Sequence, residues 1–256
     1  MTERAALGDD APVALVTGST SGIGAAVARR LAAEGMRVAV NSVRSKEAGE
    51  ELAASLPDAV YVAGDISVAE EAEGLVAAVV ERYGRLDVLV NSAGVTRVVP
   101  HQDLAGASAE VWREILDVNV VGTWQMCVAA MPHLRAAGGG GRGGGCVVNV
   151  SSVAGVRPAG SSIPYAVSKA AINHMTRLLA AVSGPKVRVN AVAPGLTETE
   201  WTAAGGFEGA RQWMREQSPL RRVGAPEDVA EAVVGLVRAR WVTGEVLLVD
   251  GGTHLR

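Results

Sequence analysis

The sequence predicts an α/β fold, a single doubly wound domain whose seven-stranded, mostly parallel sheet carries helices on both faces. Short β-branched runs alternate with longer helical patterns along the chain, as in repeated βα units. The 256 residues, 48% of them hydrophobic, are enough for one sizeable core. A glycine-rich turn also joins the first predicted strand to the first predicted helix, which is typical of α/β folds that bind phosphates.

The elements follow from the spacing of apolar residues. The predicted strands are the runs 13–17, 37–41, 60–63, 88–91, 146–150, 187–193 and 245–249. Apolar residues recur at three and four positions in the predicted helices, which include 23–34, 68–83, 110–134, 165–182 and 226–238. We expect residues 11–256 to form the single domain and residues 1–10 to form a flexible tail.

Two stretches interrupt this alternation. Residues 138–145 are seven glycines around Arg142, which predicts a flexible loop, and we interpret it as a tolerated surface insertion. Residues 197–218 are rich in small side chains but also hold Trp201, Phe207, Trp213 and Met214. Apolar side chains after a strand's carboxyl end suggest a mobile lid over a substrate, and a packed surface helix is the alternative.

Composition limits the partners and the compartment. Charged residues make up 20% of the chain and the net charge is −3, so we expect no nucleic-acid or membrane partner. Cys127 and Cys146 lie in apolar runs, which predicts buried thiols rather than a disulfide or a zinc site. The first ten residues lack the apolar core of a signal peptide, so we expect a cytoplasmic protein. The four histidines are scattered, and we expect no catalytic metal.

The turn after the first strand is the candidate phosphate cradle. Glycine lets the backbone approach a pyrophosphate, and the helix that follows offers free N–H groups at its start. Strand before and helix after make a dinucleotide site credible, although the spacing differs from the common G-x-G-x-x-G form. The candidate cofactor-binding residues in this turn are Gly18, Ser21, Gly22, Ile23 and Gly24.

The end of the second strand bears on the choice of cofactor. In dinucleotide folds a carboxylate there binds the adenosine ribose and would repel a 2′-phosphate. Residues 41–46 contain no carboxylate; Ser42 and Ser45 can donate hydrogen bonds, and Arg44 can pair with a phosphate. We therefore expect NADP(H) to be preferred, with NAD(H) possible, unless Arg44 only begins an ordinary solvated helix.

The sequence leaves two possible roles open for each of two polar residues. Asp65, followed by Ile66 after the third strand, could accept a hydrogen bond from an adenine amino group or could cap the next helix. Asn119 lies inside an apolar helical run, where its amide needs a partner. That partner could be a water in a proton relay or simply the backbone.

The candidate catalytic residues follow the fifth strand. Tyr165 and Lys169 are four apart, which places a phenol and an ammonium on one helix face. A tyrosine working near neutrality needs its pKa lowered by roughly three units, which Lys169 and a positively charged nicotinamide could supply. Ser152, thirteen residues upstream at the strand's carboxyl end, could hold the substrate oxygen, whereas a turn-forming serine pair is the alternative.

These motifs together resemble the short-chain dehydrogenase/reductase family, and the match extends over about residues 13–252. Within that family the sequence is most similar to 3-oxoacyl-acyl-carrier-protein reductases and related ketoreductases, through residues 38–41. The residues that carry the resemblance are Thr17 to Gly24, Asn91, Ser92, Ala93, Gly94, Asn119, Ser152, Tyr165, Lys169, Pro194 and Gly195. Ser92 stands where a second asparagine is commoner in the family, and the glycine run at 138–145 is outside its pattern.

The resemblance implies a Rossmann domain, a homotetramer or dimer, and hydride transfer between a nicotinamide and a substrate carbon. Tyr165 would give the proton, Ser152 would polarise the carbonyl, and Lys169 would bind the nicotinamide ribose while lowering the tyrosine's pKa. Asn119 would anchor a water. The other implied cofactor contacts are Asn91, Ala93 and Gly94 on the adenosine side and Pro194, Gly195, Thr197 and Thr199 against the nicotinamide.

The leading hypothesis is therefore an NADPH-dependent ketoreductase acting on a small-molecule carbonyl substrate, with an acyl-thioester among the candidates. Alcohol oxidation is the alternative reaction. A cofactor-binding regulator without turnover is a further alternative, which the presence of both Tyr165 and Lys169 disfavours.

Overall fold

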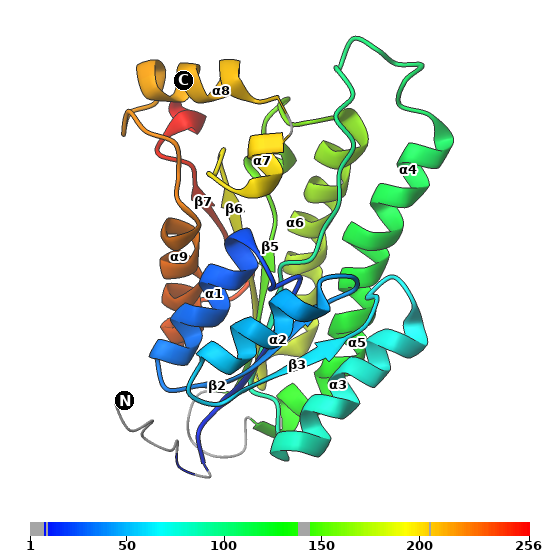
Figure 1. Ribbon diagram of the computed structural model, residues 1–256, viewed down its shortest axis with the longest axis vertical. Coiled ribbons are helices and arrows are strands. Elements are labelled where there is room, and N and C mark those ends of the chain that lie inside the picture. The colour runs from blue at the N-terminus through cyan, green and yellow to red at the C-terminus, as the bar shows by residue number, and fades with distance from the viewer. Residues whose placement is uncertain (1–7, 9, 138–143, 205) are drawn as a thin grey trace.

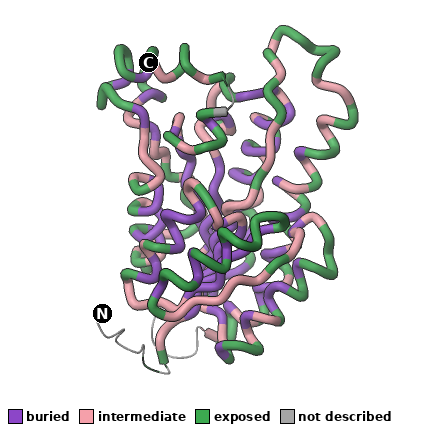
Figure 2. The backbone as a smooth tube through the Cα atoms, viewed as in Figure 1, coloured by how far each residue is buried: buried purple, intermediate pink, exposed green. Residues whose placement is uncertain are grey.

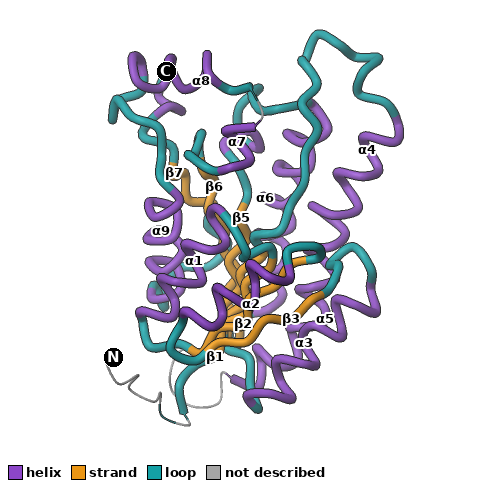
Figure 3. Tube along the Cα trace, in the orientation of Figure 1, coloured by secondary structure: helices purple, strands orange, loops and turns teal. Residues whose placement is uncertain are grey.

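The computed structural model describes residues 8, 10–137, 144–204 and 206–256. One sheet of seven strands occupies the centre, and every pairing among the described strands is parallel. The strands are β1 (Val13–Thr17), β2 (Arg37–Ser42), β3 (Ala59–Ala63), β4 (Val88–Asn91), β5 (Gly145–Val150), β6 (Val187–Pro194) and β7 (Val246–Val249). Figure 3 shows them as a twisted stack enclosed by helices.

Helices connect successive strands and cover both faces of the sheet (Figure 1). They are α1 (Gly22–Ala33), α2 (Lys46–Ser55), α3 (Ala69–Tyr83), α4 (Ala109–Leu116), α5 (Thr123–Ala137), α6 (Ile163–Ser183), α7 (Glu200–Ala204), α8 (Glu208–Gln217) and α9 (Pro226–Arg238). Short 3₁₀ turns follow β5 and β7, at Val153–Gly155 and Thr253–Leu255. The prediction of a doubly wound α/β domain is confirmed.

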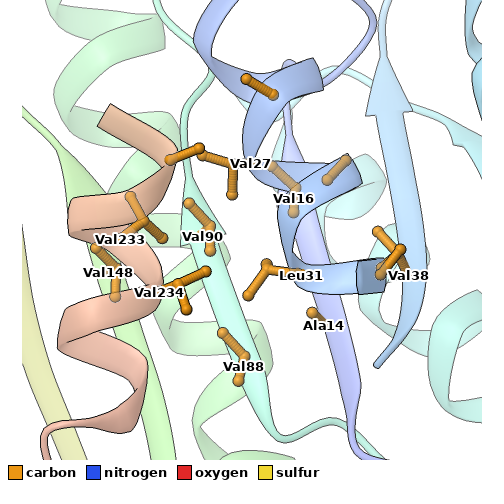
Figure 4. Packing of buried hydrophobic residues seen from close by; sticks show 14 of the residues in the cluster. Ala14, Val16, Val27, Leu31, Val38, Val88, Val90, Val148, Val233 and Val234 are labelled. Carbon is orange, nitrogen blue, oxygen red and sulfur yellow. The ribbon is translucent and has the colours of Figure 1, made fainter. Parts of the chain in front are cut away.

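Two hydrophobic cores hold these layers together. On one face, helices α1, α2 and α9 pack on alternate residues of the strands; Figure 4 shows Leu31 of α1 and Val233 of α9 on either side of Val90 of β4. On the other face, α3, α5 and α6 cover the intervening residues, such as Leu15 and Leu89. The five inner strands are therefore buried on both sides, as Figure 2 shows by the buried colour at the centre, whereas the edge strands β3 and β7 are partly exposed. Burial on both faces explains the apolar runs of the inner strands.

The strand order β3-β2-β1-β4-β5-β6-β7 reverses direction between β1 and β4. At such a point the connections leaving the two strands run to opposite faces of the sheet and leave a crevice at the carboxyl ends. The loops after β1, β4, β5 and β6 all reach this edge. In Figure 1, α7 and α8 lie beyond the same edge, near the C-terminus.

Strand and helix bounds agree with the predictions to within one or two residues, with three corrections. Helix α2 was not among the expected helices. The single helix expected over 110–134 is α4 and α5 joined by a π-helical turn, Asp117–Gly122, in which the Thr123 hydroxyl donates to the Asn119 carbonyl oxygen at 2.7 Å. Gly145 belongs to β5 rather than to the glycine loop. Residues 138–143 of that loop, and most of the expected tail, lie outside the described residues.

Candidate functional site

A cavity of about 450 Å³ lies at the carboxyl edge of the sheet, where the strand order reverses. Its wall contains thirteen of the predicted site residues, drawn from the loops after β1, β4, β5 and β6 and from α6. They are Gly18, Ser21, Gly22, Ile23, Gly24, Gly94, Ser152, Tyr165, Lys169, Pro194, Gly195, Thr197 and Thr199. The sequence motifs that carry chemistry thus meet in one place.

The turn between β1 and α1 depends on glycine. Gly18 has φ +59°, and a Cβ there would lie 2.6 Å from the Ala93 Cα. A Cβ on Gly24 would lie 2.3 Å from the Gly18 carbonyl oxygen, so both glycines are required for the turn to close. Ser21, at the N-cap of α1, makes no side-chain capping hydrogen bond, which leaves first-turn N–H groups facing the cavity. This end of the cavity suits an anionic group.

Helix α6 places Tyr165 and Lys169. Its N-cap, Ser162, accepts a hydrogen bond from the Tyr165 backbone N–H at 3.3 Å, and Pro164 occupies the first turn. Lys169 follows one turn later on the same face. Its Nζ donates to the Val150 carbonyl oxygen at 2.9 Å and lies 5.6 Å from the centre of the Tyr165 ring. Both side chains are buried, and both line the cavity.

Burial dominates the electrostatics of this pair. It raises the pKa of Tyr165 to about 12, against a smaller lowering by the hydrogen bond with Ser152. Burial also lowers the pKa of Lys169 to about 8. Desolvation is the largest of these causes, and a lowering of the Tyr165 pKa by Lys169 together with a positively charged nicotinamide stays a prediction. The phenol is neutral near pH 7.

Asn119 and Gly94 border the lysine. The Asn119 amide accepts from the Val95 N–H at 2.8 Å and donates to the Val95 carbonyl oxygen and the Ser168 hydroxyl, both at 3.0 Å. Its protein partners are thus backbone and side-chain groups, and a water anchored at Asn119 stays a prediction. A Cβ on Gly94 would lie 3.2 Å from Asn119 Oδ1 and 3.6 Å from Lys169 Nζ. Because Gly94 has no side chain, the space over the lysine stays open.

Several predicted cofactor residues lie outside the cavity wall. Ile66 is buried in the hydrophobic core beside Gly122, so its side chain cannot contact a cofactor in this arrangement. Asn91 is also buried and donates to Asn149 Oδ1 at 2.9 Å. Asp65 accepts from the Ser67 N–H and hydroxyl, at 2.9 and 2.7 Å, as expected of a residue that orders the turn before α3. Ala93 contacts Gly18 and donates its N–H to the Thr17 hydroxyl.

The three predicted residues at and just after the end of β2 lie outside the cavity wall. The Ser42 hydroxyl lies 3.0 Å from the Tyr61 hydroxyl and accepts from the Ser45 N–H. Arg44 and Ser45 are exposed, and Arg44 forms no ion pair or hydrogen bond with any residue that the structure describes. Its guanidinium is available to an anion.

The stretch 197–218 folds into α7 and α8 over the cavity. Trp201 on α7 and Trp213 and Met214 on α8 line the cavity wall together with Phe207 between the helices. The stretch is thus largely helical and faces the site, while its movement as a lid stays a prediction.

Part of the cavity wall could not be predicted from the sequence. Arg157, Ser161 and Thr253 line the cavity but belong to no motif. The Arg157 guanidinium donates to the backbone carbonyl oxygens of Thr253 and Arg256, which brings the segment after β7 against the loop after β5. Nothing in the sequence signals this contact, because its acceptors are backbone atoms nearly a hundred residues away.

Comparison with known proteins decides the family. Residues 18–254 match the family model described as enoyl-(acyl carrier protein) reductase. A protein of Streptomyces violaceoruber, assigned as ketoacyl reductase 2 of the granaticin polyketide synthase, is 64% identical over 96% of this chain and 97% of its own. The chain belongs to the short-chain dehydrogenase/reductase family.

More distant members of the short-chain dehydrogenase/reductase family have other activities in their names. Glucose 1-dehydrogenase 2 of Bacillus subtilis is 38% identical over 94% of both chains. A crystal structure of a Burkholderia xenovorans protein assigned to the same family has a TM-score of 0.88, 36% identity and coverage of 96% of this chain and 99% of that chain. Membership implies an oxidoreductase with a nicotinamide dinucleotide cofactor.

The residues present fit such a cofactor. The glycine turn and the uncapped first turn of α1 suit a pyrophosphate, and the cavity continues from there to Tyr165 and Lys169. Within the described part of the chain, no helix has the length and apolar character needed to cross a bilayer.

Proposed function

We propose that this short-chain dehydrogenase/reductase uses NADPH to reduce a ketone, including the 3-oxoacyl type, to an alcohol, with Tyr165 as the proton donor. The observation that carries the proposal is a neutral phenol, with its pKa raised to about 12, in the wall of a cavity that also contains the glycine turn. A donor has to hold its proton until the carbonyl oxygen needs it. Relatives of the ketoacyl reductase type support the same reaction.

Three side chains act in the reduction of the carbonyl group. When bound, the reduced cofactor supplies the hydride that adds to the carbonyl carbon. Tyr165 donates its proton to the carbonyl oxygen, and the Ser152 hydroxyl, which is hydrogen-bonded to Tyr165, holds that oxygen in place. Hydride and proton together complete the alcohol. Lys169, with a pKa of about 8, is suited to return a proton to the phenolate.

The preference for NADPH rests on the end of β2. Arg44 is exposed and without a partner among the described residues, and its guanidinium can hold a 2′-phosphate in a fork. No carboxylate occupies residues 41–46 to repel that phosphate. Gly18, Ser21, Ile23 and Gly94 would hold the rest of the dinucleotide, with Thr197 and Thr199 against the nicotinamide.

A homotetramer, or a dimer, is the assembly we infer. Helix α5 and the turn before it expose Val121, Trp124 and Val128 at spacings of three and four, and α6 exposes Leu178 and Val182 four apart. Apolar stripes of this kind suit contacts between copies. Light scattering of the purified protein measures the assembly.

We also infer a cytoplasmic location, because Cys127 and Cys146 are buried free thiols.

The substitution Tyr165→Phe tests the function. It removes only the hydroxyl, so the ring contacts and the fold should persist while turnover of a ketone with NADPH falls by about a thousandfold or more. NADPH affinity, measured by fluorescence titration, should stay within about threefold of the wild type. Equal turnover in the two proteins would overturn the mechanism, and a tenfold preference of the wild type for NADH would overturn the cofactor assignment.

A further inference from the structure

The aromatic side chains of this protein are concentrated at its site. The chain has only five Trp, three Tyr and one Phe. Four of these, Tyr165, Trp201, Phe207 and Trp213, line the cavity described above. Aromatic residues contribute large, rigid apolar surface, so their concentration bears on which substrate the cavity accepts.

Trp201 is the aromatic residue nearest to the reacting group. Its ring meets the Tyr165 ring edge to face, with centroids 5.9 Å apart and planes inclined by 62°. In the same structure the Trp201 side chain remains 48% exposed, although it lines the cavity wall. An indole that is anchored beside the phenol but still accessible offers a surface on which a flat group of a substrate can stack.

Three hydroxyl groups of the wall are already paired with other protein groups, whereas the exposed Glu200 carboxylate, also in the wall, has no ion pair or hydrogen bond with the described residues. The Ser161 hydroxyl lies 2.6 Å from the Thr96 hydroxyl, and the Thr253 hydroxyl donates to Asp250 Oδ2 at 2.7 Å. The Thr202 hydroxyl donates to the Thr197 carbonyl oxygen at 2.7 Å.

The cation in this wall is also engaged. The Arg157 guanidinium donates to two backbone carbonyl oxygens, those of Thr253 and Arg256. A substrate with several hydroxyl groups would have to break such bonds or leave some of its own hydroxyls unpaired, which weakens its binding. Together with the aromatic side chains, these occupied groups favour an apolar molecule over a sugar.

We propose that Trp201 determines substrate specificity, selecting ketones that carry a flat, apolar ring beside the carbonyl over polyhydroxylated ones. The inference rests on the proposed ketone reduction and adds the substrate class. Trp201 stacks on the ring of the substrate, and Tyr165, whose own ring Trp201 contacts, then faces the carbonyl oxygen. Trp213 and Phe207 complete the apolar wall.

The test compares three ketones with NADPH: 2-tetralone, which is a flat fused-ring ketone; ethyl acetoacetate, an open-chain 3-oxo ester; and dihydroxyacetone. The wild type should have a kcat/KM for 2-tetralone about a hundredfold above that for dihydroxyacetone. In Trp201→Ala the KM for 2-tetralone should rise about tenfold, the effect of about 1.4 kcal/mol of lost stacking, while the KM for ethyl acetoacetate changes less than about threefold. Trp201→Phe should restore most of the affinity for 2-tetralone.

Controls separate a lost stacking surface from a damaged fold. Trp241→Ala is the matched control, because Trp241 is 99% exposed and does not line the cavity, and its kinetics should equal those of the wild type. NADPH affinity should be unchanged in every variant. If Trp201→Ala does not fold, Trp201→Leu keeps the apolar bulk without the aromatic face and should show the same selective loss.

The outcomes distinguish the inference from the function on which it rests. If the wild type reduces none of the three ketones, the proposed function fails. If the wild type reduces them but prefers dihydroxyacetone, or if the Trp201 variants lose all ketones equally or none, the role of Trp201 is overturned while ketone reduction stands.

Discussion

Lys169 donates a hydrogen bond from its Nζ to the carbonyl oxygen of Val150 across 2.9 Å, at the carboxyl end of β5. This bond fastens the face of α6 that carries Tyr165 to the strand that ends beside Ser152. A long, flexible side chain is thereby held in one geometry, at the cost of keeping an ammonium out of water. That cost should be measurable.

Replacing Lys169 with Met should change how stability depends on pH. The pKa of Lys169 is lowered to about 8 in the folded protein, from 10.5 in the unfolded chain, so between these values the unfolded chain holds more of this proton. The folded state is penalised below pH 8, and the penalty disappears as the pH rises toward 10.5. The free energy of unfolding of the wild type should therefore rise relative to that of Lys169→Met between pH 7.5 and 10. Parallel curves from urea denaturation would contradict the burial of the charge.

Replacing Arg44 with Asp should exchange the cofactor preference. The carboxylate would repel a 2′-phosphate and could bind the ribose hydroxyls, so the KM for NADPH should rise about tenfold or more while that for NADH does not rise. Arg113→Asp makes the same charge change at an exposed position of α4, outside the cavity wall, and should leave both KM values unaltered. An equal effect of the two substitutions would show that net charge, rather than a phosphate contact, decides the preference.

Two helical glycines should respond to alanine in opposite directions. A Cβ on Gly24 would lie 2.3 Å from the Gly18 carbonyl oxygen and 2.8 Å from the Ser19 Cα, so Gly24→Ala should destabilise the fold by about 1–3 kcal/mol and weaken NADPH binding. Gly74, in α3, has no heavy atom within 4 Å of such a Cβ. Gly74→Ala should stabilise the fold by about 0.5–1 kcal/mol because alanine favours a helix. Thermal unfolding of the two variants checks both signs.

Arg188 should contribute strongly to stability from a position remote from the catalytic cavity. Its guanidinium donates to the carbonyl oxygens of Leu236, Val237 and Ala239, at 2.7–3.0 Å, at the carboxyl end of α9. Arg188→Met would leave these acceptors without donors, and we expect a loss of about 2–4 kcal/mol in the free energy of unfolding. Arg240→Met, at an exposed position nearby, should change it by less than about 0.5 kcal/mol. Similar losses for both would contradict the capping role.

The alternation of strands and helices could be predicted because strands buried on both faces, such as β1 and β4, need unbroken apolar runs. The meeting of Gly18, Ser152 and Tyr165 could be predicted because the carboxyl ends of parallel strands share one edge.

The other features of the fold and the site depend on contacts that leave no local pattern in the sequence. Ile66 directly follows Asp65, yet its side chain enters the core. The raised pKa of Tyr165 reflects burial by elements distant in sequence, and it opposes the effect expected from its neighbour Lys169. Helix α2 is polar on most of its surface, so its apolar periodicity is weak. The π-helical turn that presents Asn119 interrupts a pattern that is otherwise continuous from α4 to α5.

Helices α7 and α8 are encoded by one stretch, 200–217, whereas Tyr165, Lys169, the glycine turn and the threonines against the nicotinamide come from elsewhere in the chain. The residues that support hydride transfer and the surface that selects substrates consequently lie in separate segments of the chain. Grafting the corresponding stretch of a sugar-oxidising relative onto this scaffold would transplant its substrate choice and leave the proton donor untouched, which makes this segment the natural target for evolution and for protein engineering alike.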